Sequence, residues 1–403
     1  MELSLENLKR ALDEPGRTAD VCSTLLGAWF ENISRRLGDA LSAKGSEGSE
    51  SRAAVDAVAR SIPHLDSSAR RRLLGSPWVS GFLDNPSGVA YENENGESIS
   101  TIHALLLAVL AENPDRQLHC RSGELSDHSP HESALGDWTL KHQRGRTERV
   151  ERPRLGGVIV LDGDSRLSRR YEAESGTFCR PYLDISQEEM DAIGEKLEAA
   201  IHMLDEAAPH LGLLVRTFTR RVLVRKSIEE GEDVALLNLG SEYRPIHAGC
   251  IRMLNVHRTE MTVDLCAEAI LHESVHSFLS AYEDVYGKFM SGSIRVRPVS
   301  PWSGNFIPNH SLAHAVFVYY AIHQLLDHVR RCPSTFDPIM LKRMKRRLMH
   351  VDGGFFIESR MSTLFLLDFP ASAEFMGLVD NVQSVIKRID RPSADGVIAE
   401  DLT

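Results

Sequence analysis

The chain has 403 residues, of which 42% are hydrophobic and 26% charged, so it is long enough to bury a large core. Its formal net charge of −11 argues against general binding to nucleic acid. The six cysteines are scattered without a C-x-x-C pair, no signal peptide is visible, and the longest apolar stretch, residues 104–111, is too short to span a bilayer. These features predict a cytoplasmic protein that is not embedded in a membrane.

The N-terminal part of the chain, residues 1–112, is predicted to be helical. Apolar side chains recur there at helix spacing, among them Leu25, Trp29, Ile33 and Leu37. Residues 84–98 contain Asn-Pro and Asn-Gly pairs and are predicted to form a loop. The polar residues 113–157 are predicted to form either a long loop or an irregular small sheet.

Strands and helices alternate in the next part of the chain. Residues 158–161 read Val-Ile-Val-Leu and predict a buried strand. Ser186 and Glu189 have the spacing of a capping box, which predicts a helix from there to about residue 208. Residues 213–225 are predicted as a strand because valines alternate with other residues near its end.

A strand over residues 250–256 is predicted shortly before a helix that begins near Thr262 and ends at Gly287. By analogy with zincin-like sites, an edge strand at this place offers backbone partners to a bound peptide. A second helix is predicted from about Asn309, and the chain is mostly helical from there to about residue 389.

These elements predict an α+β fold, mainly helical, with a small mixed sheet beside the helix that begins near Thr262. The predicted regions are an N-terminal helical region (1–112), a metal-binding catalytic region (113–390) and a flexible tail (391–403).

The most specific motif is His272-Glu273-Ser274-Val275-His276, which reads H-E-x-x-H within the first of these two helices. Residues four apart lie one above the other on a helix, so both imidazoles can reach one metal ion while Glu273 lies beside them. Two histidines and a carboxylate suit hydrolysis at Zn(II) or oxygen chemistry at Fe(II), and the motif alone leaves both open. Two core histidines held by hydrogen bonds are the simpler interpretation, but burying them with a carboxylate costs free energy.

A working metal site needs a third protein ligand. Leu279 and Tyr282 occupy the positions where a metzincin has Gly and His, which excludes that class, and Glu358 has no recognisable setting. The best candidates are His310 and His314, which are also four residues apart on one predicted helix. Only one is needed as a ligand, and the other can orient a ligand or the substrate.

The sequence resembles the HExxH-motif proteins of ribosomal peptide natural-product clusters, which are regarded as iron- and 2-oxoglutarate-dependent peptide β-hydroxylases. The resemblance is carried by residues 271–276, 300–302, 308 and 312–315, and more weakly by residues 73–79. In particular, Pro301, Trp302, Pro308 and His314 match the family's Pro-Trp, later Pro and short apolar helix with a histidine.

The resemblance implies that His272, His276 and His314 hold Fe(II), with 2-oxoglutarate and O2 as cosubstrates and a ribosomally synthesised precursor peptide as partner. It gives Glu273 a role next to the metal ligands or in proton handling. His310 is expected to bind substrate or to orient a ligand, and Trp302 is expected either to form a wall of the active site or to belong to the core. Family members often carry arginines after the Pro-Trp and before the later Pro, where this chain has serine and isoleucine. Nearby alternatives for the 2-oxoglutarate carboxylate are Arg295 and Arg297.

Two other functions remain open from the residues. In a Zn(II)-dependent metallopeptidase, Glu273 would be the general base for a metal-bound water. In a non-catalytic peptide-binding protein the fold would be kept without turnover. The basic residues 342–347 are read as a solvated helix face, and a dock for an acidic leader peptide is the more specific interpretation.

Overall fold

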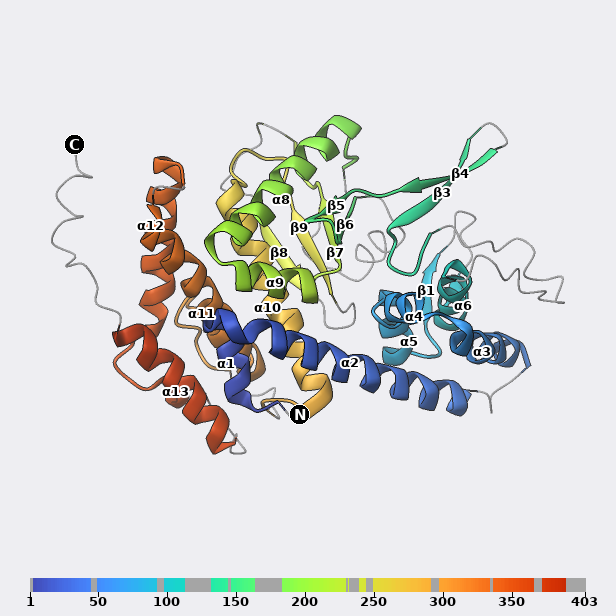
Figure 1. Ribbon diagram of the computed structural model, residues 1–403, viewed down its shortest axis with the longest axis horizontal. Coiled ribbons are helices and arrows are strands. Elements are labelled where there is room, and N and C mark those ends of the chain that lie inside the picture. Colours follow the sequence, from blue (N-terminus) through green and yellow to red (C-terminus); the bar gives the residue numbers. More distant parts are fainter. Residues whose placement is uncertain are drawn as a thin grey trace. The chain divides into compact units, whose positions relative to one another are not determined.

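The computed structural model describes residues 3–44, 49–92, 98–112, 132–143, 146–163, 183–229, 231, 239–243, 249–290, 297–333, 336–365 and 372–388. Most of these residues lie in helices, and the largest sheet is a mixed one of five strands (Figure 1). The predicted α+β class with a small mixed sheet is therefore confirmed. No helix in the described parts of the chain is long and apolar enough to cross a bilayer.

The chain divides into two compact units. The larger unit is Gly16–Tyr286, and the smaller one combines Met1–Pro15 with Gly287–Thr403. The predicted boundary near residue 112 falls inside the larger unit, and the predicted division into a helical and a catalytic region stays a prediction. The predicted tail, 391–403, lies outside the described residues.

The five-stranded sheet of the larger unit has the order β5-β6-β7-β9-β8. The three inner strands are parallel, and the outer two are antiparallel to their neighbours. Every residue of β6 and β7 is buried, which is typical of parallel strands covered on both faces. The strands are β5 (Arg154–Leu155), β6 (Ile159–Asp162), β7 (Arg221–Arg225), β8 (Gly240–Tyr243) and β9 (Cys250–Leu254).

Three helices pack against one another beside this sheet, and the last of them also contacts β8 and β9. They are α8 (Gln187–Ala207), α9 (Pro209–Phe218) and α10 (Val263–Tyr286). The predicted capping box is present, since Ser186 and Glu189 each bond the other's backbone N–H at the start of α8. The predicted start of α10 is also confirmed.

Two of the strand predictions need correction. Residues 213–218 belong to α9, and the strand begins only at Arg221. The helix begins at Pro209, and its buried residues have helical spacing. This pattern was overlooked because the valines that follow it alternate as in a strand. The buried residues are Leu211, Leu214, Val215 and Phe218. The strand before α10 is confirmed as β9, but β9 lies inside the sheet, and β8 is the outermost described strand at that end.

The rest of the larger unit is mostly helical, as predicted for residues 1–112. Its helices are α2 (Pro15–Lys44), α3 (Ser49–Ser61), α4 (Ser67–Leu74), α5 (Pro77–Asp84) and α6 (Thr101–Ala111), with the 3-10 turn η1 (Ile62–His64). The predicted loop at 84–98 contains part of an antiparallel pair, β1 (Val89–Glu92) with β2 (Ser98–Ser100). A second antiparallel pair, β3 (Trp138–Gln143) with β4 (Arg146–Glu151), favours the small-sheet interpretation of residues 113–157.

The smaller unit is a set of helices around an apolar core. Its elements are α1 (Leu5–Asp13), α11 (Asn309–Arg331), α12 (Pro338–Phe355), η4 (Met361–Leu364) and α13 (Ala373–Arg388). The Tyr320 hydroxyl of α11 donates to Asp13 of α1 at 2.6 Å, which ties the N-terminal helix to this unit. The basic residues 342–347 lie on α12.

Candidate metal centre

The H-E-x-x-H motif lies in the middle of α10, where apolar anchors hold the helix in the core of the larger unit. His272 and His276 are half-buried, whereas Glu273 is only 4% exposed. The carboxylate therefore points into the protein and the two imidazoles lie nearer the surface. The anchors, all fully buried, are Ile270, Leu271, Val275, Phe278 and Leu279.

The three motif side chains fit a single metal ion. His272, Glu273 and His276 each offer one ligand atom, and these atoms all lie within 4.8 Å of one another. The two imidazole centroids are 5.1 Å apart. Transition-metal ligands lie about 2 Å from the ion, so two of them are at most about 4 Å apart across it, a separation close to the one found here. The predicted pairing of His272 with His276 is thus present.

Glu273 is held by β8, the strand antiparallel to β9. The Ser241 hydroxyl donates to its Oε1 at 2.6 Å, and the Tyr243 backbone N–H donates to the same carboxyl. Burial raises the pKa of Glu273 to about 7, and these two hydrogen bonds only partly offset that effect. The carboxyl is therefore fixed in place by neutral donors and has no cationic partner among these contacts.

Tyr243 also contacts the metal motif directly. Its ring lies parallel to that of His276, with centroids 6.1 Å apart and an interplanar angle of 1°. Ser241 and Tyr243 are two residues apart on a strand, so both side chains point to the same face, toward α10. Neither residue was found by the sequence analysis, because a four-residue strand has too short an alternation to be recognised.

Ser274, between the two motif histidines, ties α10 to the turn that leads into β7. Its hydroxyl is 2.6 Å from the Ile270 carbonyl and 2.5 Å from the Thr219 hydroxyl, and the residue is fully buried. Because these contacts fix the rotation of α10 about its axis, they also fix the direction in which the imidazoles point.

His310 and His314 lie in the smaller unit and form a pair on the first turns of α11. Their ring centroids are 4.4 Å apart, and Phe289 packs edge-on against His314 at 5.8 Å. His314 is 3% exposed. The expected helix-face pairing is therefore present, while the role of His314 as third ligand stays a prediction.

The remaining predicted site residues are also in the smaller unit. Trp302 is buried, donates from Nε1 to the Val351 carbonyl at 2.9 Å and stacks on Tyr319 at 4.3 Å, which are the contacts of a core residue. Arg297 is exposed, and Arg295 lies outside the described residues. Their assignment to a 2-oxoglutarate carboxylate stays a prediction.

No protein-family model matches the chain, and a search of curated proteins finds no relative. The interpretation of the site therefore depends on its geometry and on the motif itself.

Proposed function

We propose that the protein is an iron(II)- and 2-oxoglutarate-dependent oxygenase that β-hydroxylates a side chain of a ribosomally made precursor peptide. The observation that carries this proposal is the difference in burial and in hydrogen bonding between the two histidines and the glutamate of the motif. His272 and His276 are half-buried and offer ligand atoms within 4.8 Å of each other, whereas the Glu273 carboxyl, which lies within the same distance, is buried and already accepts a hydrogen bond from Ser241. The resemblance of the motif and of the Pro-Trp segment to peptide β-hydroxylases supports the same choice.

His272 and His276 would hold the metal, and His314 is proposed as the third ligand. When bound, iron(II) with 2-oxoglutarate supplies the oxidising power to put one atom of O2 into a C–H bond and the other into succinate, with release of CO2. The protein's own residues bind, orient and exclude water around this chemistry. Two imidazoles that keep other coordination positions open suit such a role.

Glu273 acts next to the ligands. Because Ser241 and the Tyr243 backbone both donate to its carboxyl, the side chain is held against β8, with one carboxylate oxygen within 4.8 Å of a ring nitrogen of each motif histidine. From there it keeps α10 and β8 in register, and it can hold or release a proton without being a ligand.

β8 is suited to position a peptide. Among the described strands it pairs with β9 alone, so apart from the Tyr243 N–H, which donates to Glu273, its other side can offer backbone donors and acceptors to an extended chain. A peptide paired with this strand passes Ser241 and Tyr243 and therefore runs alongside the ring of His276.

The deciding experiment is anaerobic purification with Fe(II), followed by assays for succinate formation and for a mass gain of one oxygen on a candidate precursor peptide. His272→Ala, His276→Ala and His314→Ala are each expected to lose metal and turnover. His202→Ala, an exposed α8 histidine, is the control that retains both. Full activity of His314→Ala would refute its assignment as a ligand, and peptide turnover without 2-oxoglutarate would refute the reaction class.

A zinc metallopeptidase is the second candidate. It is favoured by one observation, an antiparallel outer strand beside the H-E-x-x-H helix, which can pair with a scissile peptide. The hydrogen bonds from Ser241 and from the Tyr243 N–H count against it, because they engage the carboxyl that a general base would turn to a metal-bound water. Zn(II)-dependent peptide cleavage that ignores 2-oxoglutarate would establish it.

A further inference from the structure

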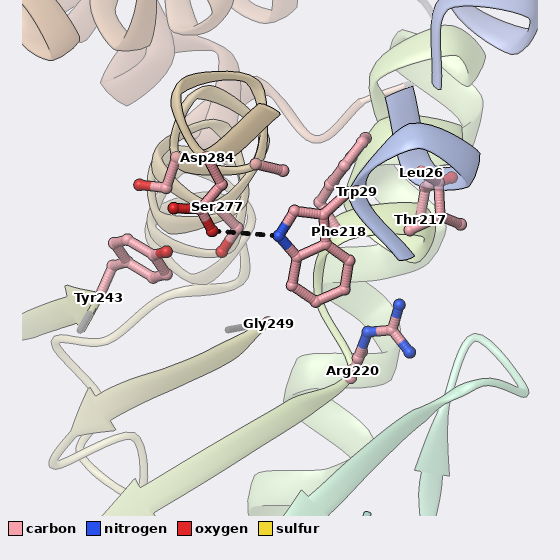
Figure 2. Close-up of a pocket in the computed structure, with 11 residues that line it drawn as sticks. Leu26, Trp29, Thr217, Phe218, Arg220, Tyr243, Gly249, Ser277 and Asp284 are labelled. Carbon is pink, nitrogen blue, oxygen red and sulfur yellow. Dashed lines mark hydrogen bonds between the residues drawn. The ribbon is translucent and has the colours of Figure 1, made fainter. Parts of the chain in front are cut away.

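A small cavity of about 20 Å³ lies within the larger unit, between α2, the end of α9, the sheet and α10 (Figure 2). This volume holds one water molecule or the head group of a ligand whose remainder lies outside. The side chains that matter for its chemistry are those of Trp29, Arg220, Tyr243 and Asp284.

Arg220 lies directly before β7, and its guanidinium contacts aromatic rings. Its Cζ lies 5.0 Å from the centroid of Phe30 and 5.7 Å from that of Trp29, so the cation packs on two aromatic rings of α2. A Cβ at Gly75 would collide with the guanidinium, and one at Gly249 would press on the aliphatic part of the side chain. The side chain is therefore confined between two glycines and two rings.

No residue in the described part of the chain balances the charge of Arg220. Among the residues that the structure describes, its guanidinium has no hydrogen bond and no ion pair, whereas Arg72 binds both Asp137 and Glu112. Arg220 is half-buried, and this burial lowers the pKa of its guanidinium to about 10. A partly buried guanidinium of this kind is stabilised by an anion that reaches it in good hydrogen-bonding geometry.

The other polar groups of the cavity are already engaged. Asp284 accepts from Trp29 Nε1 at 3.2 Å and lies 3.9 Å from Arg36, while the Thr217 and Ser277 hydroxyls donate to backbone carbonyls. Figure 2 shows the hydrogen bond from Trp29 Nε1 to Asp284 and the guanidinium of Arg220 near the Trp29 ring. Arg220 is thus the donor that remains for a ligand.

We propose that this cavity is a binding site for a carboxylate group, held by the Arg220 fork. A single guanidinium matches a planar monoanion in charge and in bidentate geometry, whereas phosphate carries more charge than one arginine balances. The cavity adjoins the metal motif through Tyr243, which lines it and stacks on His276. The carboxylate comes either from a small free acid or from the C-terminus of a peptide laid along β8, which ends at Tyr243.

The test measures binding, not turnover, so its result is independent of the proposed oxygenase reaction. Full-length protein is titrated calorimetrically at constant ionic strength with acetate, and with tetra-alanine carrying either a free or an amidated C-terminus. Arg220→Met removes the fork, and Arg35→Met removes the same charge from an exposed site on α2. Metal content is measured in every sample, because acetate can also bind a metal.

We expect saturable acetate binding with a Kd on the order of millimolar, weakened at least about tenfold by Arg220→Met and unchanged by Arg35→Met. Tighter binding of the acid peptide than of its amide identifies a peptide terminus, and binding of acetate alone identifies a small acid. Equal binding by wild type and Arg220→Met, or no saturable binding of either carboxylate, overturns the proposal. If Arg220→Met has a lower melting temperature than the wild type, Arg220→Gln is used in its place. If neither variant folds, the titrations of the wild type decide the question.

Discussion

Glu273 and Asp137 are both buried carboxylates of the larger unit, 4% and 2% exposed, but Asp137 is bound by cations and Glu273 by neutral donors. Asp137 receives a bidentate pair of bonds from Arg72 at 2.8 Å and another from Arg154 at 2.6 Å. Within the described part of the chain, Glu273 receives bonds from one hydroxyl and one backbone N–H.

The pKa values of the two groups move in opposite directions for this reason. Burial alone would raise both, and it does raise the pKa of Glu273 to about 7. For Asp137 the effect of burial is overcome by Arg72, Ser133 and Arg154, so its pKa lies below the ordinary 3.8. A buried carboxylate neutralised by arginines stabilises the fold, whereas one held by neutral donors next to metal-ligand side chains is available for chemistry.

Asp137→Asn is expected to give the largest effect on stability. The amide leaves Arg72 and Arg154 facing a neutral group in a largely buried site, which should lower the free energy of unfolding by about 3 kcal/mol. Urea unfolding followed by circular dichroism measures this. Asp205→Asn is the matched control, because Asp205 pairs with Arg216 at the surface and should change stability by less than about 1 kcal/mol. Similar losses in both variants would show that burial of the pair is unimportant.

Acid should erase the difference between wild type and Asp137→Asn. Since the folded pKa of Asp137 is depressed, its contribution is fully present above the unfolded value near 3.8 and is lost as the pH falls through the lower folded value. The gap in unfolding free energy between the two proteins should therefore stay constant from about pH 7 to 5 and shrink toward about pH 3. A gap that is independent of pH in urea titrations would mean that the Asp137 charge contributes nothing.

Glu273→Gln should lower turnover and leave stability almost unchanged, whereas Asp137→Asn mainly lowers stability. The amide oxygen can still accept from Ser241 and Tyr243, so stability should stay within about 1 kcal/mol of wild type. Loss of a carboxyl that orients metal ligands or handles a proton should reduce turnover by about 10- to 100-fold while bound metal is largely retained. Activity assays, metal analysis and thermal melts measure the three quantities. Glu195→Gln, an exposed change on α8, is the control, and a destabilised but fully active Glu273→Gln would reverse the comparison.

The motif itself was predictable because its signal is local. The spacing of His272 and His276 and the apolar anchors around them lie within a few residues, and the same is true of the capping box at Ser186 and Glu189. α11 and its histidine pair were likewise visible from periodicity alone.

The partners of the motif were not predictable, because they depend on tertiary pairing. Ser241 and Glu273 are 32 residues apart in the sequence, and the strand that carries Ser241 has only four residues. The order of the sheet, which makes β8 rather than β9 the outer strand, depends on contacts of the same kind. The wrong strand prediction for residues 213–218 has a local cause. The helical spacing of α9 is followed after two residues by the alternating valines of β7, so the two patterns were taken for one strand.

Ser241→Ala should give the smallest effect and would sharpen the comparison most. It removes one of the two donors to Glu273 without touching the carboxyl, so unfolding should become easier by about 1 kcal/mol. Turnover should fall less than in Glu273→Gln, because the Tyr243 backbone N–H still restrains the carboxyl. Ser42→Ala, which removes an exposed hydroxyl that donates to Gly38 on α2, is the control for loss of a serine hydroxyl. If Ser241→Ala and Ser42→Ala both matched wild type in stability and turnover, the Ser241 hydroxyl would not be what holds Glu273 in place, and the Tyr243 backbone N–H would be the donor of β8 that restrains the carboxyl.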